Sequence, residues 1–303
     1  MQATRDIKRR IKSIQSTHKI TRAMEMVSAA KMRKAVNRVM STRAYADLTW
    51  QTVLHLARKV DTRQHPFFRE TEVVKKIAII IISTNRGLCG GFNTQLISKV
   101  RRAMTVHEQT LAMTDFISLG SKGRNEARRR GLNIVADFIK DDITVDSLVL
   151  RPVVKMITEG FVSGQYDRVL VAYTDFESTL SQKPHLKQLL PFAANIDERL
   201  GHIAHREPLD TVRIEEQVDF ILEPSVREVF DSFLPRLLEV QLLQSVLESE
   251  ASEHSARMMT MRNASESASE MMEELTLIYN QARQAGITAE IAEISAGAAA
   301  MAD

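Results

Sequence analysis

The sequence predicts an α/β fold class combined with a long α-helical coiled coil, because helix-breaking residues and charges are unevenly distributed. The first 65 residues contain no Gly or Pro, and the 68 residues after Pro235 contain no Pro and only Gly286 and Gly297. Gly and Pro are the residues that most reliably end helices. Residues 1–60 carry 14 Lys+Arg against 3 Asp+Glu, whereas residues 208–303 carry 6 against 18. We therefore expect two long terminal helices of opposite charge that pair antiparallel.

The N-terminal helix is expected over residues 3–59. Residues recur there at alternating steps of three and four, the spacing that places side chains on one helix face. The stripe consists of Ile7, Ile11, Ile14 and His18, followed by Met32, Val36, Val39, Arg43, Ala46, Trp50, Val53, Ala57 and Val60. At 1.5 Å per residue this helix would be roughly 85 Å long. Part of it must therefore project from any compact domain.

The C-terminal helix is expected to begin after Ser225, a candidate N-cap with Glu228 as its capping-box partner, and to run to about Ala300. Pro235 is expected to kink or interrupt it early. Its stripe consists of Leu247, Ala251, His254, Met258, Met261, Ser265, Ala268, Met272, Leu275, Tyr279 and Ala282. Because this helix is longer than its partner, its tip is expected to project alone. Residues 287–301 are apolar nearly all round, which predicts an enclosing apolar partner surface.

The central part of the chain alternates between strand and helix patterns, which predicts a small three-layer α/β domain with a largely parallel sheet. The expected strands are 77–82, 115–119, 134–138 and 166–173. The expected helices are 94–105, 125–130 and 149–163, the expected loops are 61–72 and 195–211, and 212–222 is expected to be extended. The predicted domains are an N-terminal coiled-coil helix, a central α/β domain, and an extended segment with the C-terminal helix. Their ranges are 1–60, 61–211 and 212–303.

Composition excludes several classes of protein. The single cysteine, Cys89, excludes an intramolecular disulfide and a CxxC metal site, and it fits a reducing compartment. No apolar run reaches about 18 residues, so no transmembrane helix is expected. The first residues lack the apolar core of a signal peptide. The overall charge of +3 hides the asymmetry of the two ends and is no evidence for nucleic-acid binding.

Two glycine-rich turns follow strands and precede helices, where phosphate-binding loops occur. Gly87–Gly91 matches neither GxGxxG nor GxxxxGK[ST], so a structural turn is favoured. Gly120–Gly123 could also contact an anion, although a structural turn is favoured there as well. Cys89 lacks the neighbouring histidine that a nucleophile needs, and the pair His202 and His205 lacks a third metal ligand. No catalytic residue, cofactor or metal is expected.

The basic residues of the N-terminal helix leave three interpretations open. Nucleic-acid binding through Lys8–Lys34 is one, although no aromatic residues interleave the basic ones. A solvated helix face is the second. The third is an electrostatic surface for an acidic partner, with the acidic C-terminal helix neutralising part of the charge.

Four segments, spread over nearly the whole chain, resemble the γ subunits of F-type ATP synthases, of the bacterial type. The terminal segments resemble the family's two signatures, and the other segments resemble its central loop and the end of its α/β domain. The segments are 20–34 (ITRAMEMVSAAKMRK), 83–93 (STNRGLCGGFN), 181–184 (SQKP) with 189–191 (LLP), and 275–291 (LTLIYNQARQAGITAEI). The resemblance implies a central Rossmann-like α/β domain beside the helical pair.

The resemblance further implies a non-catalytic rotor. The helical pair would stand inside a ring of α and β subunits, and the α/β domain would lie near the ε subunit and the membrane c-ring. The rotor would couple proton-driven rotation of the c-ring to ATP synthesis at the β subunits, and would regulate ATPase activity and proton flow. The chain would be a peripheral protein at the cytoplasmic face of a bacterial plasma membrane, or else a mature organelle protein, without membrane insertion or nucleic acid.

Residue roles follow from the same resemblance. One group would face an acidic loop of β: Met24, Lys31, Arg33 and Lys34. A polar cluster would engage another β loop: Arg283, Gln284, Thr288 and Glu290. The tip inside an apolar sleeve of the ring would include Ile287, Ile291 and Ile294. The segment facing the c-ring would include Phe220, Leu222 and Glu223, and relatives often have tyrosines there.

Two alternatives to the rotor remain at this point. One is a nucleotide-binding α/β enzyme, which requires a nucleotide at Gly87–Gly91. The other is a basic coiled coil that binds nucleic acid through Lys8–Lys34, which requires steeply salt-dependent DNA binding.

Overall fold

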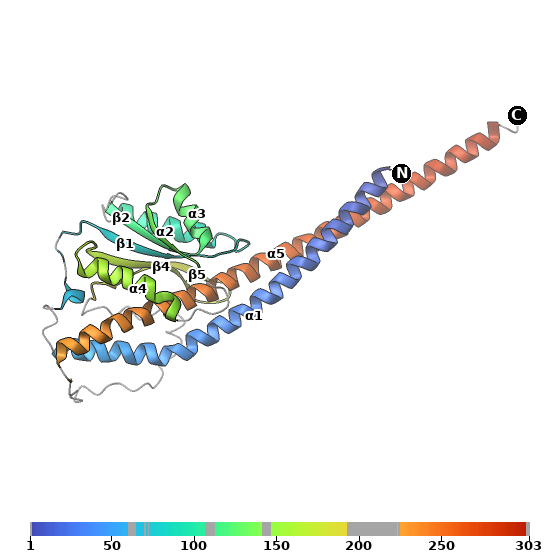
Figure 1. Cartoon of the computed structure of the whole chain (residues 1–303). Coiled ribbons are helices and arrows are strands. Elements are labelled where there is room, and N and C mark those ends of the chain that lie inside the picture. Colours follow the sequence, from blue (N-terminus) through green and yellow to red (C-terminus); the bar gives the residue numbers. More distant parts are fainter. Residues whose placement is uncertain are drawn as a thin grey trace. The chain divides into compact units, whose positions relative to one another are not determined.

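The computed structural model describes residues 2–59, 65–69, 71, 73–106, 113–140, 147–192, 223 and 225–300. By their contacts, residues 1–29 and 257–303 form one compact unit and residues 30–256 form another. The elements in chain order are α1 (Gln2–Lys59), η2 (Pro66–Phe68), β1 (Ile77–Ile82), α2 (Phe92–Val106), β2 (Thr114–Leu119), α3 (Ser121–Arg129), β3 (Ile134–Phe138), α4 (Ser147–Val162), β4 (Arg168–Phe176), β5 (Gln182–Leu190) and α5 (Val226–Ala300). Figure 1 labels these elements except η2 and β3. The division into 1–60, 61–211 and 212–303 stays a prediction.

Both predicted terminal helices are confirmed as single elements. The N-cap of α5 is the predicted Ser225, whose Oγ accepts from the backbone N–H of Glu228 at 3.3 Å. The expected interruption at Pro235 is wrong, because α5 continues through it. Proline removes one backbone donor from a helix, but Leu234 and Leu237 on either side are fully buried in the core. We infer that this packing holds the helix together across the proline.

A five-stranded sheet in the order β3-β2-β1-β4-β5 forms the centre of the second unit. The strands β3, β2, β1 and β4 are parallel, as predicted, and β5 joins β4 antiparallel. The sequence analysis did not identify β5. It contains Pro184, its exposure alternates along its length, and it lies at the sheet edge, where a proline is tolerated.

The isoleucine run of β1 divides between two cores because alternate side chains of a strand point to opposite faces. Ile77, Ile79 and Ile81 pack with α2 and α3. Ala78 and Ile80 pack on the other face with α4 and with the residues of α5 from Phe230 to Val246. The predicted three layers are therefore present. One layer, however, includes the start of α5, which the sequence analysis assigned wholly to the coiled coil.

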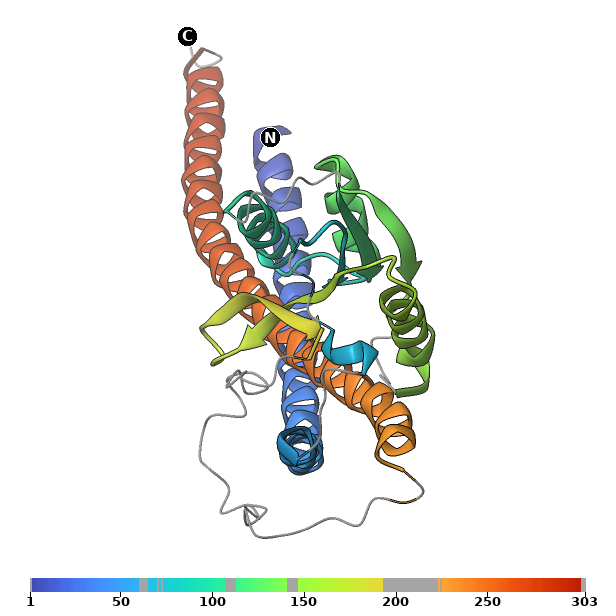
Figure 2. The same ribbon diagram turned by 90° about the vertical axis from the view of Figure 1, so that its left-hand side faces the viewer.

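The two helices of the unit formed by 1–29 and 257–303 run antiparallel, with both chain ends at the same end of the unit (Figures 1 and 2). The predicted stripes face inward. On α5 the buried or half-buried members are Met258, Met261, Ser265, Ala268, Met272, Leu275, Tyr279 and Ala282. On α1 they are Ile7, Ile11, Ile14 and His18, and Ser28, which was not part of the predicted stripe, is also buried. His18 thus packs within the pair, as expected.

In the unit 30–256, α1 buries Met32, Ala35 and Val39. Thr42 Oγ1 donates to Gln244 Oε1 of α5 at 3.2 Å, so the two helices are in contact here as well. The side chains of the remaining predicted stripe, from Arg43 to Val60, lie outside the described residues. The predicted loop 195–211 and extended segment 212–222 also lie outside them.

Candidate functional site

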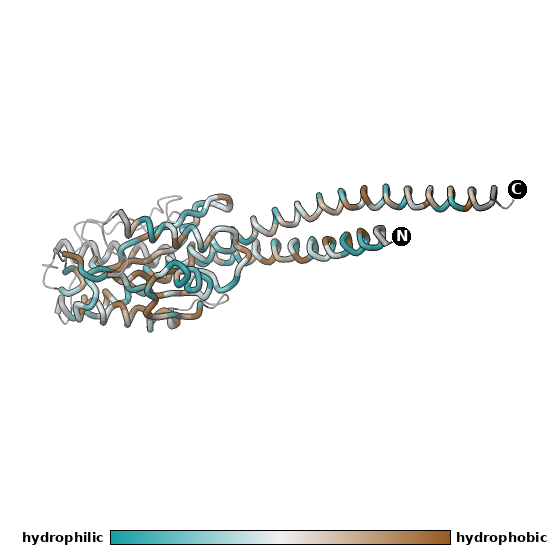
Figure 3. The backbone as a smooth tube through the Cα atoms, turned by 90° about the horizontal axis from the view of Figure 1, so that it is seen from above, coloured by the Kyte–Doolittle hydropathy of each residue, from teal (hydrophilic) through white to brown (hydrophobic). Residues whose placement is uncertain are grey.

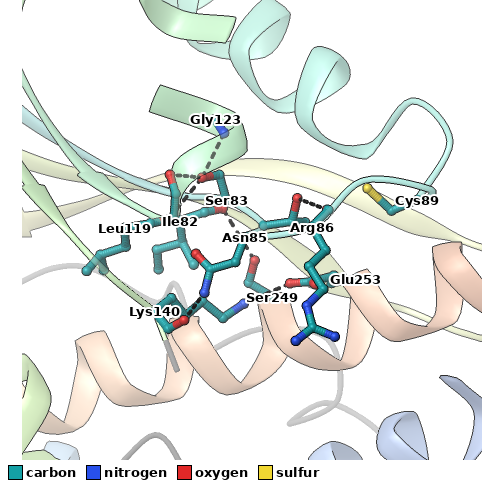
Figure 4. Close-up of polar contacts among 12 residues, drawn as sticks. Ile82, Ser83, Asn85, Arg86, Cys89, Leu119, Gly123, Lys140, Ser249 and Glu253 are labelled. Carbon is teal, nitrogen blue, oxygen red and sulfur yellow. Dashed lines mark hydrogen bonds and ion pairs between the residues drawn. The ribbon is translucent and has the colours of Figure 1, made fainter. Parts of the chain in front are cut away.

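The first candidate site, Gly120–Gly123 at the start of α3, is filled by the chain itself. Gly123 N donates to Ser83 Oγ at 3.1 Å (Figure 4), and Lys122 N donates to the carbonyl of Thr84 at 2.9 Å. A Cβ at position 123 would lie 2.2 Å from Ser83 Cβ, so only glycine fits. These helix-terminal amides bind the turn after β1, and the interpretation as an anion site receives no support.

The second candidate, Gly87–Gly91, is a packed turn, as the sequence analysis favoured. Thr84 N donates to Asn93 Oδ1 at 3.2 Å, and Gln95 N donates to the carbonyl of Gly91 at 2.8 Å. Cys89 is a buried residue of this turn, and its Sγ accepts from Asn93 Nδ2 at 3.7 Å. The turn therefore connects β1 to α2 through internal hydrogen bonds and resembles no phosphate cradle.

The described part of the chain contains no cluster of side chains that could form a metal site. No group of three His, Cys, Asp or Glu side chains within it could hold a metal ion. The pair His202 and His205 lies outside the described residues. His254, the other stripe histidine, is buried on α5 and has interactions there.

The end of α5 is the most unusual surface of its unit. Every residue from 283 to 296 is exposed, and Figure 3 shows α5 continuing beyond the N-terminal end of α1. Ile287, Ile291 and Ile294 are 47%, 59% and 72% exposed. Their spacing of four and three places them on one helix face, a stripe that the sequence analysis did not recognise. Among the described residues, no helix is long and apolar enough to cross a membrane.

The polar residues predicted to contact partners lie on the helix surfaces. On α5, Arg283, Gln284, Thr288 and Glu290 are exposed, and Thr288 Oγ1 donates only within the helix, to the carbonyl of Gln284 at 3.0 Å. On α1, Arg33 and Lys34 are exposed, while Met24 and Lys31 are half-buried. Glu223 is exposed, and Phe220 and Leu222 lie outside the described residues. The geometry presents these groups to solvent without assigning them a partner.

A charged cluster that the sequence analysis missed lies between α5 and the carboxyl ends of the strands. Lys140 Nζ forms an ion pair with Glu253 Oε2 at 2.9 Å, and the two side chains are 3% and 2% exposed. Asn85 Nδ2 donates to the carbonyl of Lys140, and Ser249 Oγ donates to the carbonyl of Ile82 at 3.5 Å (Figure 4). We call this region the α5 joint, defined by Lys140, Asp175, Lys187, Glu248 and Glu253.

The α5 joint holds an unusual carboxyl group. Burial, followed by the negative charge of Asp175, raises the pKa of Glu248 to about 8. No sequence signal marks these residues, because a glutamate on a long acidic helix is ordinarily solvated. Only the packing of α5 onto the sheet distinguishes the buried Glu248 and Glu253 from exposed glutamates of the same helix, such as Glu270.

Comparisons with known proteins agree with one another. The model of the family described as ATP synthase matches residues 3–301. The chain is 41% identical to the ATP synthase gamma chain of Roseiflexus castenholzii, covering 100% of both chains. It is 40% identical to the ATP synthase gamma chain of Xanthomonas oryzae pv. oryzae, covering 99% of this chain and 100% of the relative.

Solved structures show the same fold. One chain of the Euglena gracilis mitochondrial ATP synthase, OSCP/F1/c-ring in rotational state 3, matches with a TM-score of 0.67 at 20% identity, covering 99% of this chain and 94% of that one. A chain of the Tetrahymena thermophila mitochondrial ATP synthase central stalk and c-ring matches with a TM-score of 0.60 at 23% identity, covering 81% and 99%.

Proposed function

Since this chain belongs to the family of ATP synthase gamma chains, we propose that it is the central-stalk rotor subunit of an F-type ATP synthase. It couples proton-driven rotation of the c-ring to ATP synthesis at the catalytic β subunits, and it regulates ATPase activity and proton flow. The observation that carries this proposal is the exposed apolar end of α5, which extends past its helical partner.

The exposed end of α5 requires a partner surface. Three isoleucines on one face of a solvated helix are a liability for an isolated chain, because apolar surface favours burial. A ring of α and β subunits with an apolar sleeve would cover them. Residues 287–301, with Ile287, Ile291 and Ile294 as the apolar contacts, form the tip in this proposal.

Polar contacts with the β subunits would accompany the apolar ones. Arg283, Gln284, Thr288 and Glu290 are proposed to engage one β loop, and their exposure leaves them accessible to it. Four further residues are proposed to face an acidic β loop: Met24, Lys31, Arg33 and Lys34. The net positive charge of residues 1–60 suits an acidic partner.

The α/β domain is proposed to contact the ε subunit and the c-ring. The segment with Phe220, Leu222 and Glu223 is the proposed c-ring contact, and the exposure of Glu223 is compatible with it. The chain would then be peripheral at the cytoplasmic face of a bacterial plasma membrane, reaching the bilayer only through its partners. The bacterial relatives of similar length support this placement.

The proposed mechanism is mechanical. Each orientation of the rotor would contact the three β subunits differently and so stabilise a different conformation of each, which is a shift of populations by differential contact. No bond would be made on this chain, and the one glycine turn that the nucleotide-enzyme alternative required, Gly87–Gly91, is held by internal hydrogen bonds. We therefore propose a non-catalytic subunit without a cofactor.

Co-purification tests the function. The tagged full chain, expressed with the α and β subunits of its source, is expected to recover both of them together with ATPase activity. The same tag on the chain truncated after residue 282 is the control, because it keeps the described helix pair and removes the exposed end. A full chain that purifies without α, β or ATPase activity would refute the proposal.

A further inference from the structure

The contact between α5 and the sheet changes character along its length. From Phe230 to Leu238 the buried residues of α5 are apolar, and they pack on apolar strand residues. Buried polar residues begin at Gln241, and from Glu248 to Ser255 every residue is buried and most are polar or charged. The second stretch lies at the carboxyl ends of the strands, where Ser249 Oγ donates to the carbonyl of Ile82. The α5 joint is thus a buried polar contact at the end of an apolar one.

The charges of the α5 joint do not balance if every group is ionised. It contains three carboxyl groups, Asp175, Glu248 and Glu253, and two ammonium groups, Lys140 and Lys187, all at least nine-tenths buried. Lys140 pairs with Glu253. Asp175 and Lys187 both act on Glu248. Two buried carboxylates next to each other are costly, which favours one neutral carboxyl group.

The surroundings of Glu248 identify it as the neutral group. Its Oε1 accepts from Gln244 Nε2 at 3.1 Å, and Gln244 in turn accepts from Thr42 of α1. No hydrogen-bond donor among the described residues reaches its Oε2, which is buried. Asp175 of β4 and Lys187 of β5 act on it electrostatically. A proton on Glu248 would supply the missing donor, directed at the carboxylate of Asp175.

The other charged groups near Glu248 are engaged elsewhere. Glu253, one turn further along α5, is held by Lys140 from the residues after β3. Glu250 and His254 are buried on α5 itself and have interactions of their own. Lys187 therefore remains the one buried ammonium group that acts on Glu248 among the residues the structure describes.

We propose that Glu248 is a proton-held lock between α5 and the sheet. When α5 is seated, Glu248 carries a proton and donates a hydrogen bond to the carboxylate of Asp175, whose charge Lys187 balances. When the proton leaves to solvent, two carboxylates face each other without a donor between them, and the packing of α5 against the sheet becomes weaker. The lock is a property of this chain alone. At alkaline pH α5 would be packed less firmly on the sheet. That this affects torque rests on the proposed rotor function.

Protonation of Glu248 stabilises the packing of α5 against the sheet. The pKa of Glu248 rises from its ordinary value of 4.5 to about 8. Between about pH 4.5 and pH 8, Glu248 therefore holds a proton when α5 is packed on the sheet and loses it when α5 detaches. The packing is most stable below about pH 4.5 and becomes less stable as pH rises. Its opening constant increases by about tenfold per pH unit until about pH 8 and then stays level.

Carboxyl carbon NMR of the full chain labelled at glutamate tests the lock directly. One glutamate signal is expected to titrate with a midpoint near 8, and it should disappear in Glu248→Gln. In Asp175→Asn the same midpoint is expected to fall, because the second negative charge is removed. A wild-type spectrum in which every glutamate titrates below pH 6 would overturn the proposal, and this reading needs no variant to fold.

Hydrogen exchange over residues 244–255 tests the mechanical part. After correction for the intrinsic rate, the opening constant of the wild type should rise about fiftyfold between pH 6 and pH 8. It should be nearly flat in Glu248→Gln, which keeps a neutral group of the same shape. Glu270→Gln, an exposed glutamate on the same helix, is the matched control and should retain the wild-type slope. Equal slopes in wild type and Glu248→Gln would refute the lock. Failure of co-purification with α and β would instead refute the rotor function and leave these readings intact.

Discussion

The exposed isoleucine stripe of α5 allows a quantitative test of docking. We predict that replacing Ile287, Ile291 and Ile294 together by serine weakens binding to the ring of α and β subunits without unfolding the free chain. The three side chains already lie in solvent at 47%, 59% and 72% exposure. Exposed substitutions of this kind change stability by no more than about 0.5 kcal/mol.

The expected loss follows from the exposed fractions. Fully burying one isoleucine side chain contributes about 1.5–3 kcal/mol. Scaled by the exposed fractions of Ile287, Ile291 and Ile294, complete burial in a sleeve contributes about 3–5 kcal/mol. At about 1.4 kcal/mol per factor of ten, the triple variant should bind between a hundredfold and a few thousandfold more weakly.

The assay is titration of a fluorescently labelled full chain with the purified ring, with denaturant unfolding of the free chain measured in parallel. The matched control is Ile139→Ser in the α/β domain, compared with Ile294→Ser on the tip. Ile139 is 83% exposed and loses the same atoms. If Ile139→Ser weakens binding as much as Ile294→Ser, or if the triple variant binds within threefold of the wild type, apolar docking of the tip is refuted.

Three further predictions concern packing, charge and partner contact. Gly123→Ala should destabilise the chain by about 1–3 kcal/mol in urea unfolding, because its Cβ would overlap the turn after β1. Lys140→Met should cost about 3–5 kcal/mol by leaving Glu253 buried without its cation, and adding Glu253→Leu should restore much of that loss. Replacing Arg283 and Gln284 by alanine should leave the unfolding free energy of the free chain within about 0.5 kcal/mol of wild type while lowering the ATPase activity of the assembled complex.

Each of these has a matched control. Gly87→Ala places a Cβ in open space and should be nearly neutral. Lys155→Met removes an ammonium group that is 75% exposed and weakly paired, so its cost should be below about 1 kcal/mol. For the alanine pair, equal losses of assembly and activity would show a structural role. Lys140→Met must lower the free energy of unfolding more than Lys155→Met does, and similar losses would contradict a buried ion pair.

Much of the fold follows from local patterns in the sequence. The terminal helices are long because Gly and Pro are nearly absent from them, and their stripes follow the helical period. The run Ile77–Ile82 is a strand that is buried on both faces, as its composition indicates. The strand β5 escaped prediction because an edge strand with alternating exposure and a proline resembles a loop.

Other features depend on contacts that no local pattern encodes. The helix α3 begins earlier than predicted, at Ser121, because its first amides bind residues of the turn after β1. The early interruption at Pro235 fails because buried leucines hold α5 to the sheet. In both cases residues distant in sequence supply the interactions that local propensity lacks.

The sequence by itself determined the two terminal helices, their opposite charges and the apolar character of the C-terminal tip, because these depend on composition and on spacing along one helix. Only the tertiary structure decided which acidic residues of α5 are solvated and which are buried. Glu248 meets Asp175 and Lys187, and Glu253 meets Lys140, because the sheet brings together strand ends that are far apart in the chain. Burial and neighbouring charge, which set the protonation of Glu248, exist only after the chain has folded.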